Sequence, residues 1–296
     1  MMEKVDRLII LILISCVFLG CQPENKNNSS KENVMKFDKI YSLQLGVDGE
    51  NKFIEYAKDS LDKQPAGMSF RDMIFTPPNL GKVSLDVAEQ KLILDHVFSV
   101  MGSNIDYDPN LKGIQTIDIN AGLNKEEFVT EEQAYQAYVN LFQQLNRNGW
   151  KNHFDVLSPR IAKEDNIKSI YDDSNVIDPA HIFTYEEWRK IFNEKVSLYY
   201  NLYLNGVYMG ITLNKRGGKE DKVQYMLRLN VSTIKYRVRN SISKSYKMSD
   251  LEFKKAYDND LLRTLKIRLV EEKERKTNGY HIDENYKDPD VWNYVK

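Results

Sequence analysis

The chain has 296 residues, of which 42% are hydrophobic and 11% aromatic, and its formal net charge is −1. This length and apolar content allow a sizeable core and exclude an intrinsically disordered protein. The nearly neutral charge provides no overall field to attract nucleic acid, so we predict no nucleic-acid partner.

The N-terminus has the pattern of a secretory signal. Two basic residues precede an uncharged run of 13 residues, Leu8 to Gly20. The run is too short for a membrane-spanning helix, which needs about 20 apolar residues, but it has the length of a signal-peptide core. The only two cysteines of the chain, Cys16 and Cys21, lie in this region. The body of the protein therefore has no disulfide and no thiol chemistry.

The end of this segment, Phe18-Leu19-Gly20-Cys21, resembles the lipobox of bacterial lipoproteins. In that family the signal is removed directly before a cysteine, whose thiol is acylated. The resemblance implies a signal peptide over residues 1–20 and lipidation of Cys21, and a multiply acylated cysteine is a stable membrane anchor. Phe18 departs from the aliphatic residue that is usual at its position. The alternative is an uncleaved N-terminal anchor helix with an incidental cysteine.

Gln22 follows the cysteine, and the next residues are polar. In lipoproteins of bacteria with two membranes, an Asp at this place favours retention in the inner membrane. The resemblance therefore implies sorting to the outer membrane, with the body facing the periplasm. The segment QPENKNNSSKEN lacks aliphatic residues, as flexible linkers do. We predict a tether over residues 21–33.

The N-terminal half of the body, residues 34–125, is predicted to mix strands and helices. Alternation of apolar and polar residues indicates strands, and spacing of three to four residues indicates helices. The predicted strands are residues 41–47, 68–75 and 113–120, and the predicted helices are residues 51–61 and 85–101. The second helix is apolar over much of its circumference, so we expect it to be buried together with His96.

The C-terminal half, residues 126–296, contains three capping boxes, which predict three helix starts. They begin at Thr130, Thr184 and Ser249. Between the first two helices we expect a short strand after Trp150 and an Asp- and Asn-rich loop over residues 164–179. The last helix is expected to reach Lys276 and to bury a stripe of Phe253, Tyr257, Leu261, Leu265 and Leu269. The aromatic-rich tail after it is expected to dock on the body.

The clearest structural signal is the run SLYYNLYLNGVYMGITL, residues 197–213. Asn205-Gly206 is a preferred type I′ turn, so Leu204 is expected to pair with Val207 in a hairpin. Opposite residues share a face, which gives the hairpin one apolar face and one face rich in tyrosine. The second face carries Tyr199, Asn201, Tyr203, Tyr208 and Thr212.

A second turn is predicted at residues 216–219, followed by a long strand over residues 223–238. The apolar positions of this strand change face near Ser232-Thr233, where we predict a bulge or bend. Taken together, the elements predict an α+β fold. It consists of a mostly antiparallel sheet, with a β-hairpin meander packed against several helices.

The sequence contains no motif typical of a nucleotide site, a serine hydrolase or a zinc protease. Its four histidines lie far apart, without the short spacing of metal ligands. Asp106 and Asp108 imitate the start of a calcium loop, but the required Gly and Glu are missing. We therefore predict no catalytic residue, no metal and no cofactor. A hydrolase remains an alternative if folding joins His153 or His181 to a carboxylate such as Asp155 or Asp178.

Four residues are the candidate partner-binding site: Tyr199, Asn201, Tyr203 and Tyr208. Tyrosine supplies contact area and a hydrogen bond, and it is enriched in protein interfaces. The alternative is that a helix covers this face of the hairpin. Charge is also uneven, since basic residues exceed acidic ones over residues 235–276 and the reverse holds over residues 120–200. A solvated surface or a partner of matching charge explains this distribution.

Several short features together resemble the envelope lipoproteins encoded beside type VI secretion effectors. They are the lipobox, the tether, Gly149-Trp150, SPRI, FTYEEW and the tyrosine-rich hairpin. Those lipoproteins are immunity proteins, which bind a periplasmic toxin from sister cells and block it. The resemblance implies a toxic effector as protein partner and no enzymatic activity. The alternative is an envelope ligand-binding or assembly lipoprotein, which holds a glycan, a lipid or a membrane protein.

Overall fold

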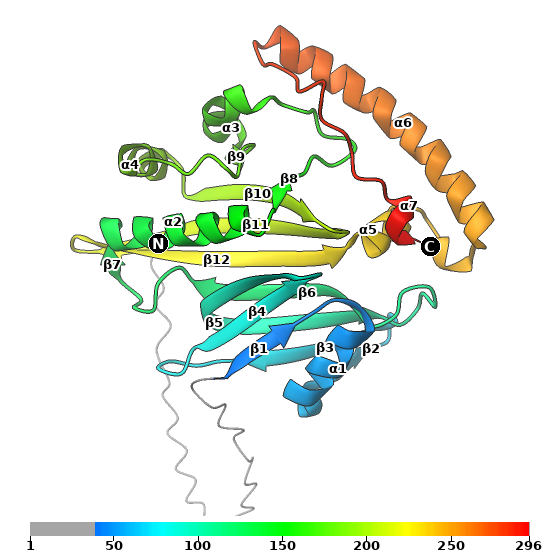
Figure 1. Ribbon diagram of the computed structural model, residues 1–296, viewed down its shortest axis with the longest axis horizontal. Helices are drawn as coiled ribbons and strands as arrows, with labels where there is room; N and C mark the ends of the chain where they lie inside the picture. The colour runs from blue at the N-terminus through cyan, green and yellow to red at the C-terminus, as the bar shows by residue number, and fades with distance from the viewer. Residues whose placement is uncertain (1–38, 296) are drawn as a thin grey trace, which may run out of the picture. The chain divides into compact units, whose positions relative to one another are not determined.

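The computed structural model describes residues 39–295, which lie in one compact unit. The predicted signal peptide, Cys21 and the predicted tether lie outside the described residues. The fold class is confirmed as α+β, with helices packed on a mostly antiparallel, mixed sheet (Figure 1). None of the helices in residues 39–295 combines the length and the apolar character that a membrane crossing requires.

Twelve strands form the sheet in the described part of the chain. They are β1 (Ile40–Leu43), β2 (Asp62–Gln64), β3 (Met68–Ile74), β4 (Gly81–Val87), β5 (Gln90–Ile105), β6 (Ile114–Gly122), β7 (Val129–Thr130), β8 (Lys151–Asn152), β9 (Asn175–Val176), β10 (Ser197–Leu204), β11 (Val207–Lys219) and β12 (Lys222–Thr233). The main order is β1-β4-β5-β6-β12-β11-β10-β8. The pairing of β6 with β12 joins the two predicted halves in one sheet.

The helices are α1 (Gly46–Tyr56), α2 (Glu131–Arg147), α3 (Asn166–Asp173), α4 (Tyr185–Glu194), α5 (Ile234–Ser241), α6 (Asp250–Thr277) and α7 (Trp292–Val295). Short 3₁₀ turns lie at Lys58–Ser60, Lys163–Asp165 and Ser245–Lys247. The three predicted capping boxes are all formed, with the side chains of Thr130, Thr184 and Ser249 accepting from the third backbone N–H of each helix.

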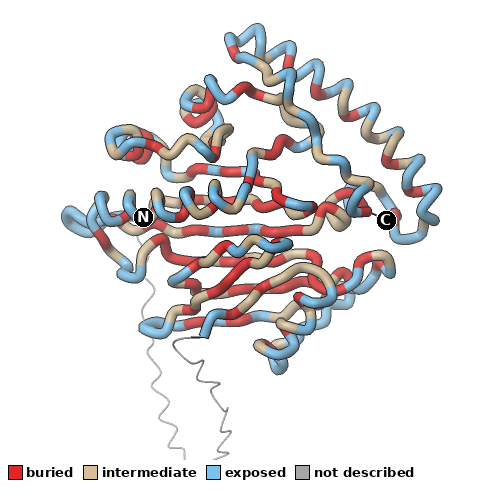
Figure 2. Tube along the Cα trace, in the orientation of Figure 1, coloured by how far each residue is buried: buried red, intermediate tan, exposed pale blue. Residues whose placement is uncertain are grey.

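One face of the sheet is apolar and covered by helices. Its central row is Tyr200, Ile211, Leu229 and Ile119, and each of these residues is at most 1% exposed. The ring of Phe142 on α2 lies 4.4 Å from that of Tyr200, and Trp188 on α4 lies 5.0 Å from Tyr225. Helix α1 places Phe53 over Gly102, where a Cβ atom would lie 2.7 Å from the phenyl ring. This packing forms the core, and Figure 2 shows the buried residues concentrated in the strands.

The predicted hairpin has the expected register, since Leu204 pairs with Val207 across Asn205 and Gly206. The second turn lies further along the chain than predicted. Strand β11 continues through the two glycines with a bulge between Lys215 and Gly217. The turn forms at Glu220, which has a positive φ of 60°. Glycines often mark turns, but here they lie in the bulged end of a strand.

The predicted helix over residues 85–101 is wrong. These residues form the end of β4, a tight turn at Ala88 and Glu89, and most of β5. Both strands alternate buried and accessible residues, and a bulge at His96, with φ of 60°, shifts the alternation by one residue. The shift made the apolar spacing similar to that of a helix, and the turn has no Gly, Asn or Asp to mark it.

The predicted long strand over residues 223–238 ends at Thr233. The hydroxyl of Thr233 caps α5 by accepting from the backbone N–H of Tyr236. The change of face near Ser232 is therefore a change from strand to helix, and the predicted bulge is absent. Two other boundaries also differ. The predicted helix over residues 51–61 corresponds to α1, but α1 begins five residues earlier, at Gly46, where the strand was expected to end, and it stops at Tyr56. Helix α3 occupies part of the predicted loop over residues 164–179.

Helix α6 starts where predicted, but its buried stripe differs from the expected one. Phe253 and Tyr257 are buried, as expected, whereas Leu269 is 60% exposed. Toward the C-terminal end, the inner face is formed by Thr264, Arg268 and Glu272. The helix therefore packs through apolar side chains in its first half and through hydrogen-bonded polar and charged side chains in its second half.

Candidate binding surfaces

The face of the sheet opposite the core remains partly uncovered. We call its central part the open sheet face, defined by two rows of directly opposite residues. They are Tyr199, Thr212, Arg228 and Asn120, and Asn201, Gly210, Asn230 and Asp118. Antiparallel sheets commonly present one such polar face to solvent. Tyr199 is 43% exposed, and the Arg228 side chain is 65% exposed.

Polar contacts organise the centre of this face. The Asn230 side-chain amide donates to Asp118 at 2.8 Å, and the Arg228 guanidinium lies 3.8 Å from the same carboxylate. The Asn120 amide donates to Ser99 at 3.1 Å. The two asparagines are held by hydrogen bonds and therefore lose little conformational freedom when a partner binds.

The structure separates the four predicted partner-binding residues into two pairs. Tyr199 and Asn201 are exposed on the open sheet face. Tyr203 is half-buried and Tyr208 is only 7% exposed, because both lie under the C-terminal helices. The alternative of a helix-covered face therefore holds at Tyr208. Burial raises the pKa of Tyr208 above its usual value, and burial likewise raises the pKa of Tyr203 to about 12.

A cavity of about 810 Å³ lies beside Tyr208 and is called the α6 cavity here. Its walls come from α5, α6, the loop after His153 and the C-terminal tail. Apolar side chains such as Leu157, Leu261 and Trp292 alternate with charged ones around it. The volume lies within the range of small-molecule sites.

His153 and Asp155 line the α6 cavity together, which is the arrangement that the hydrolase alternative requires. The His153 Nε2 atom lies 3.7 Å from Asp155 Oδ1, and Arg237 donates to the same oxygen at 2.7 Å. The His153 imidazole lowers the pKa of Asp155, burial opposes this, and the charge of Arg237 lowers it further. The carboxylate is thus held ionised in an ion pair.

The hydrogen-bond partners of His153 differ from those of a Ser-His-Asp triad. The Nδ1 atom of His153 lies 3.3 Å from the Tyr286 hydroxyl. Ser241 also lines the cavity, but its hydroxyl donates to the backbone carbonyl of Val238. Within residues 39–295, no serine or threonine hydroxyl is hydrogen-bonded to His153. The arrangement is therefore not that of a Ser-His-Asp triad, in which the histidine bonds a nucleophilic hydroxyl.

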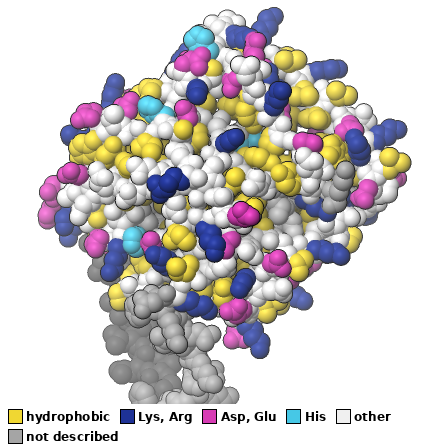
Figure 3. Space-filling model, in the orientation of Figure 1, with side chains coloured by type: hydrophobic (Ala, Val, Ile, Leu, Met, Phe, Trp, Pro, Cys, Tyr) yellow, Lys and Arg dark blue, Asp and Glu magenta, His cyan; other side chains and the backbone are white. Residues whose placement is uncertain are grey.

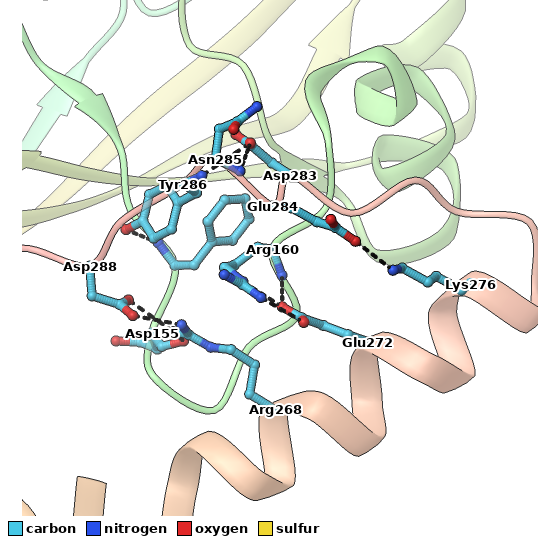
Figure 4. Close-up of polar contacts among 11 residues, drawn as sticks. Asp155, Arg160, Arg268, Glu272, Lys276, Asp283, Glu284, Asn285, Tyr286 and Asp288 are labelled. Atoms are coloured by element: carbon cyan, nitrogen blue, oxygen red, sulfur yellow. Dashed lines mark hydrogen bonds and ion pairs between the residues drawn. The ribbon is translucent and has the colours of Figure 1, made fainter. Parts of the chain in front are cut away.

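The C-terminal tail forms one wall of the cavity and is attached to α6 by ion pairs (Figure 4). Arg268, which is 2% exposed, donates to both carboxylate oxygens of Asp288 at 2.7 and 3.0 Å. It also donates to the backbone carbonyl of Asp155 at 2.8 Å. One buried guanidinium thus joins α6, the tail and the loop after His153.

A second ion pair fixes the other end of this region. Arg160 donates to both carboxylate oxygens of Glu272 at 2.7 and 2.9 Å. Burial favours a higher pKa for Glu272, but the bonds and the charge of Arg160 outweigh it, and the pKa is lowered. Folding therefore stabilises the ionised form of this carboxylate.

This lowered pKa predicts a loss of stability in acid. Because the pKa of Glu272 is lower in the folded than in the unfolded state, the ionised side chain stabilises the fold fully at pH values above its unfolded-state pKa of about 4.3. This stabilisation is lost as the pH falls through the folded-state pKa. We expect the melting temperature to fall more steeply between about pH 5 and 3 in the wild type than in Arg160→Met. Thermal unfolding followed by circular dichroism measures this. Arg263→Met breaks an exposed pair and should keep the wild-type slope, so equal slopes in all three proteins would refute the assignment.

The remaining histidines and the calcium-like segment are accounted for by local structure. His181 packs edge-on against Phe183, and its Nε2 atom lies 3.5 Å from Glu187 Oε2, so its neighbouring carboxylate is Glu187. His96 lies at the β5 bulge. Asp108 is buried and accepts from Arg239 at 3.1 Å. In residues 39–295, no group of three or more His, Cys, Asp or Glu side chains is placed to hold a metal ion.

No family model, curated protein or solved structure matches this chain.

The open sheet face includes polar residues that were not among the predicted partner-binding residues, notably Arg228, Asn230, Asp118 and Asn120. A signal for two of them was present, because Arg228 and Asn230 alternate with buried leucines and valine in β12. Their pairing with the hairpin face became visible only through the register of β11 and β12.

Proposed function

We propose that this chain is a lipid-anchored protein of the bacterial envelope whose body binds and neutralises a secreted toxic effector. This is the role of the immunity lipoproteins that the sequence resembles. The observation that supports it best is the open sheet face. An aromatic residue and an arginine, Tyr199 and Arg228, stand exposed there among amide side chains.

The composition of this face favours a protein partner. Tyrosine and arginine are the residues that most often dominate binding energy at interfaces, and asparagine adds adaptable hydrogen bonds. Tyr199 and Arg228 lie in the same row, separated only by Thr212. A partner that covers this row would desolvate both at once, which is the setting in which such residues contribute most.

A competition between sister cells tests this function. Cells that lack the chain should be killed by neighbours with an active type VI secretion system, and the full chain should restore survival. The double variant Tyr199→Ala/Arg228→Ala should restore survival poorly. Loss of hot-spot residues typically weakens binding by about 30-fold or more. The affinity for the purified effector of the killing strain provides the direct measurement.

A matched double variant controls for general effects. Tyr246→Ala/Arg189→Ala removes another exposed tyrosine and another exposed arginine, both away from the open sheet face. It should protect cells as well as the wild type does. Equal protection by both double variants, at equal protein levels, would move the interface away from the open sheet face. Survival of cells without the chain would reject the immunity function itself.

The α6 cavity favours a second candidate function, an envelope lipoprotein that holds a small ligand. Its volume of about 810 Å³ and its mixed apolar and charged lining suit such a role. The same competition distinguishes the two functions. A ligand carrier is not expected to protect cells from a toxic neighbour. Cells that lack it would therefore survive the competition as well as cells that have it.

A further inference from the structure

Helix α6 presents a second apolar surface, on the side facing away from the body. Leu251, Leu262 and Leu269 are 80%, 62% and 60% exposed. They are spaced by 11 and 7 residues, which are close to three and two turns of an α-helix, so they form one row. The residues that face the body are Phe253, Tyr257, Thr264, Arg268 and Glu272. Helix α6 therefore exposes a row of leucines on the side that faces away from the body, where an ordinary surface helix is polar.

A row of lysines runs beside the leucines. Lys255, Lys266 and Lys273 each follow a leucine by four residues, so each lies one helical turn beyond it. All three are exposed, and none forms an ion pair with any residue in 39–295. We call these three leucines and three lysines the Leu–Lys face. Figure 3 shows hydrophobic and basic side chains next to one another along the edge of the molecule where α6 runs.

Asp258 lies in the row of leucines, but a lysine outside the Leu–Lys face pairs with it. Asp258 pairs with Lys254 at 2.6 Å, and Asp260 pairs with Arg263 at 2.7 Å. Glu272 points to the body and is held by Arg160. The Leu–Lys face therefore keeps three unpaired positive charges beside three exposed leucines. An occupant with complementary chemistry is apolar and anionic.

A lipid surface matches this pattern better than a partner helix. A helix partner needs a continuous apolar seam with a side chain every three to four residues. Here Asp258 stands seven residues after Leu251, where the seam would require an apolar side chain. A membrane does not need a continuous seam, because each leucine can insert into the bilayer on its own. The lysines beside the leucines then contact anionic headgroups. The face extends over about 33 Å, given a rise of 1.5 Å per residue from Leu251 to Lys273.

We propose that the Leu–Lys face of α6 docks on a membrane surface that contains anionic lipid. The contact goes beyond the proposed function, because it orients the body on the membrane and requires neither the effector nor the acylation of Cys21. Leucines insert at the level of the headgroups, and the lysines hold the helix parallel to the surface.

A local fluorescent probe tests the docking in the full chain. Cys16 and Cys21 are replaced by serine, and an environment-sensitive dye is attached through Leu262→Cys. The apolar segment Leu8–Gly20 is expected to keep the chain on vesicles of any composition, so the readout is the surroundings of the dye. We expect its emission to shift to shorter wavelength on phosphatidylcholine–phosphatidylglycerol vesicles and to stay unchanged on phosphatidylcholine alone.

Two controls make the result specific. The dye at Glu274→Cys, an exposed position on another side of the same helix, should show no shift on either vesicle. Changing Lys255, Lys266 and Lys273 to Gln should weaken docking by about a hundredfold and abolish the shift at residue 262. These lysines are exposed and unpaired, so unchanged circular dichroism is expected.

Two results would overturn the proposal. One is an emission of the dye at residue 262 that does not shift on vesicles containing phosphatidylglycerol, or that shifts by the same amount when the three lysines are replaced. The other is a shift that appears only when the effector is added, which would make the Leu–Lys face a protein interface. The vesicle measurement contains no effector, so its failure leaves the cell-survival test of the proposed function unaffected.

Discussion

Replacing Arg239 with methionine is expected to lower the free energy of unfolding by about 3–5 kcal/mol. Arg239 is 1% exposed, and its Nε atom donates to Asp108, itself 2% exposed, at 3.1 Å. It also donates to the backbone carbonyl of Ser245 at 2.8 Å and lies over the ring of Phe253. Removing the guanidinium leaves the Asp108 carboxylate buried without its cation, which is the costly way to break a buried pair.

Urea unfolding followed by circular dichroism measures this effect, and Arg228→Met is the matched control. The Arg228 side chain is 65% exposed and lies 3.8 Å from Asp118. Exposed pairs contribute at most about 1 kcal/mol, so this variant should remain close to the wild type. The double variant Arg239→Met/Asp108→Asn should recover part of the loss, because the buried charge is gone. If Arg239→Met and Arg228→Met are equally stable, the buried pair of Arg239 and Asp108 does not contribute the expected free energy of unfolding.

Replacing Asp288 with alanine is expected to cost about 3 kcal/mol and to detach the C-terminal tail from α6. Arg268 is buried and loses both of its carboxylate bonds in this variant, although it keeps the bond to the carbonyl of Asp155. The tail that carries Asp288 also forms a wall of the α6 cavity. We therefore expect faster amide hydrogen exchange in residues 286–295 and a cavity more open to solvent.

Glu284→Ala is the matched control on the same tail. Glu284 pairs with Lys276 at 2.9 Å, but the two side chains are 74% and 52% exposed. An exposed pair contributes little, so exchange in the tail should stay near the wild-type rate. If Asp288→Ala and Glu284→Ala release the tail equally, the buried position of Arg268 is not what holds it.

Local signals in the sequence correctly predicted the three capped helix starts and the first hairpin. Thr130, Thr184 and Ser249 cap their helices because each satisfies a backbone N–H within four residues, and no distant partner is needed. Asn205-Gly206 sets the hairpin register for the same reason. The helix predicted over residues 85–101 failed because the bulge at His96 depends on pairing of β5 with β4 and β6.

The candidate binding surfaces were only partly predictable. Alternation placed Tyr199 and Tyr208 on the same face of the hairpin, and both do lie there. Their exposure differs because α5, α6 and α7 cover one end of that face and leave the other end open. The loop after His153 and the tail near Asp288 meet at the α6 cavity, although they are more than 130 residues apart in the chain. No local pattern encodes such a contact.

The sequence by itself determined the fold class, the capped helices and the two-faced hairpin, because these depend on side chains and backbone groups close together in the chain. Only the tertiary structure decided which parts of those faces meet solvent. Burial at Tyr208, exposure at Tyr199 and the unpaired lysines of α6 all depend on which distant segments pack nearby. Packing is a property of the whole chain, and the surfaces available for binding are what packing leaves uncovered.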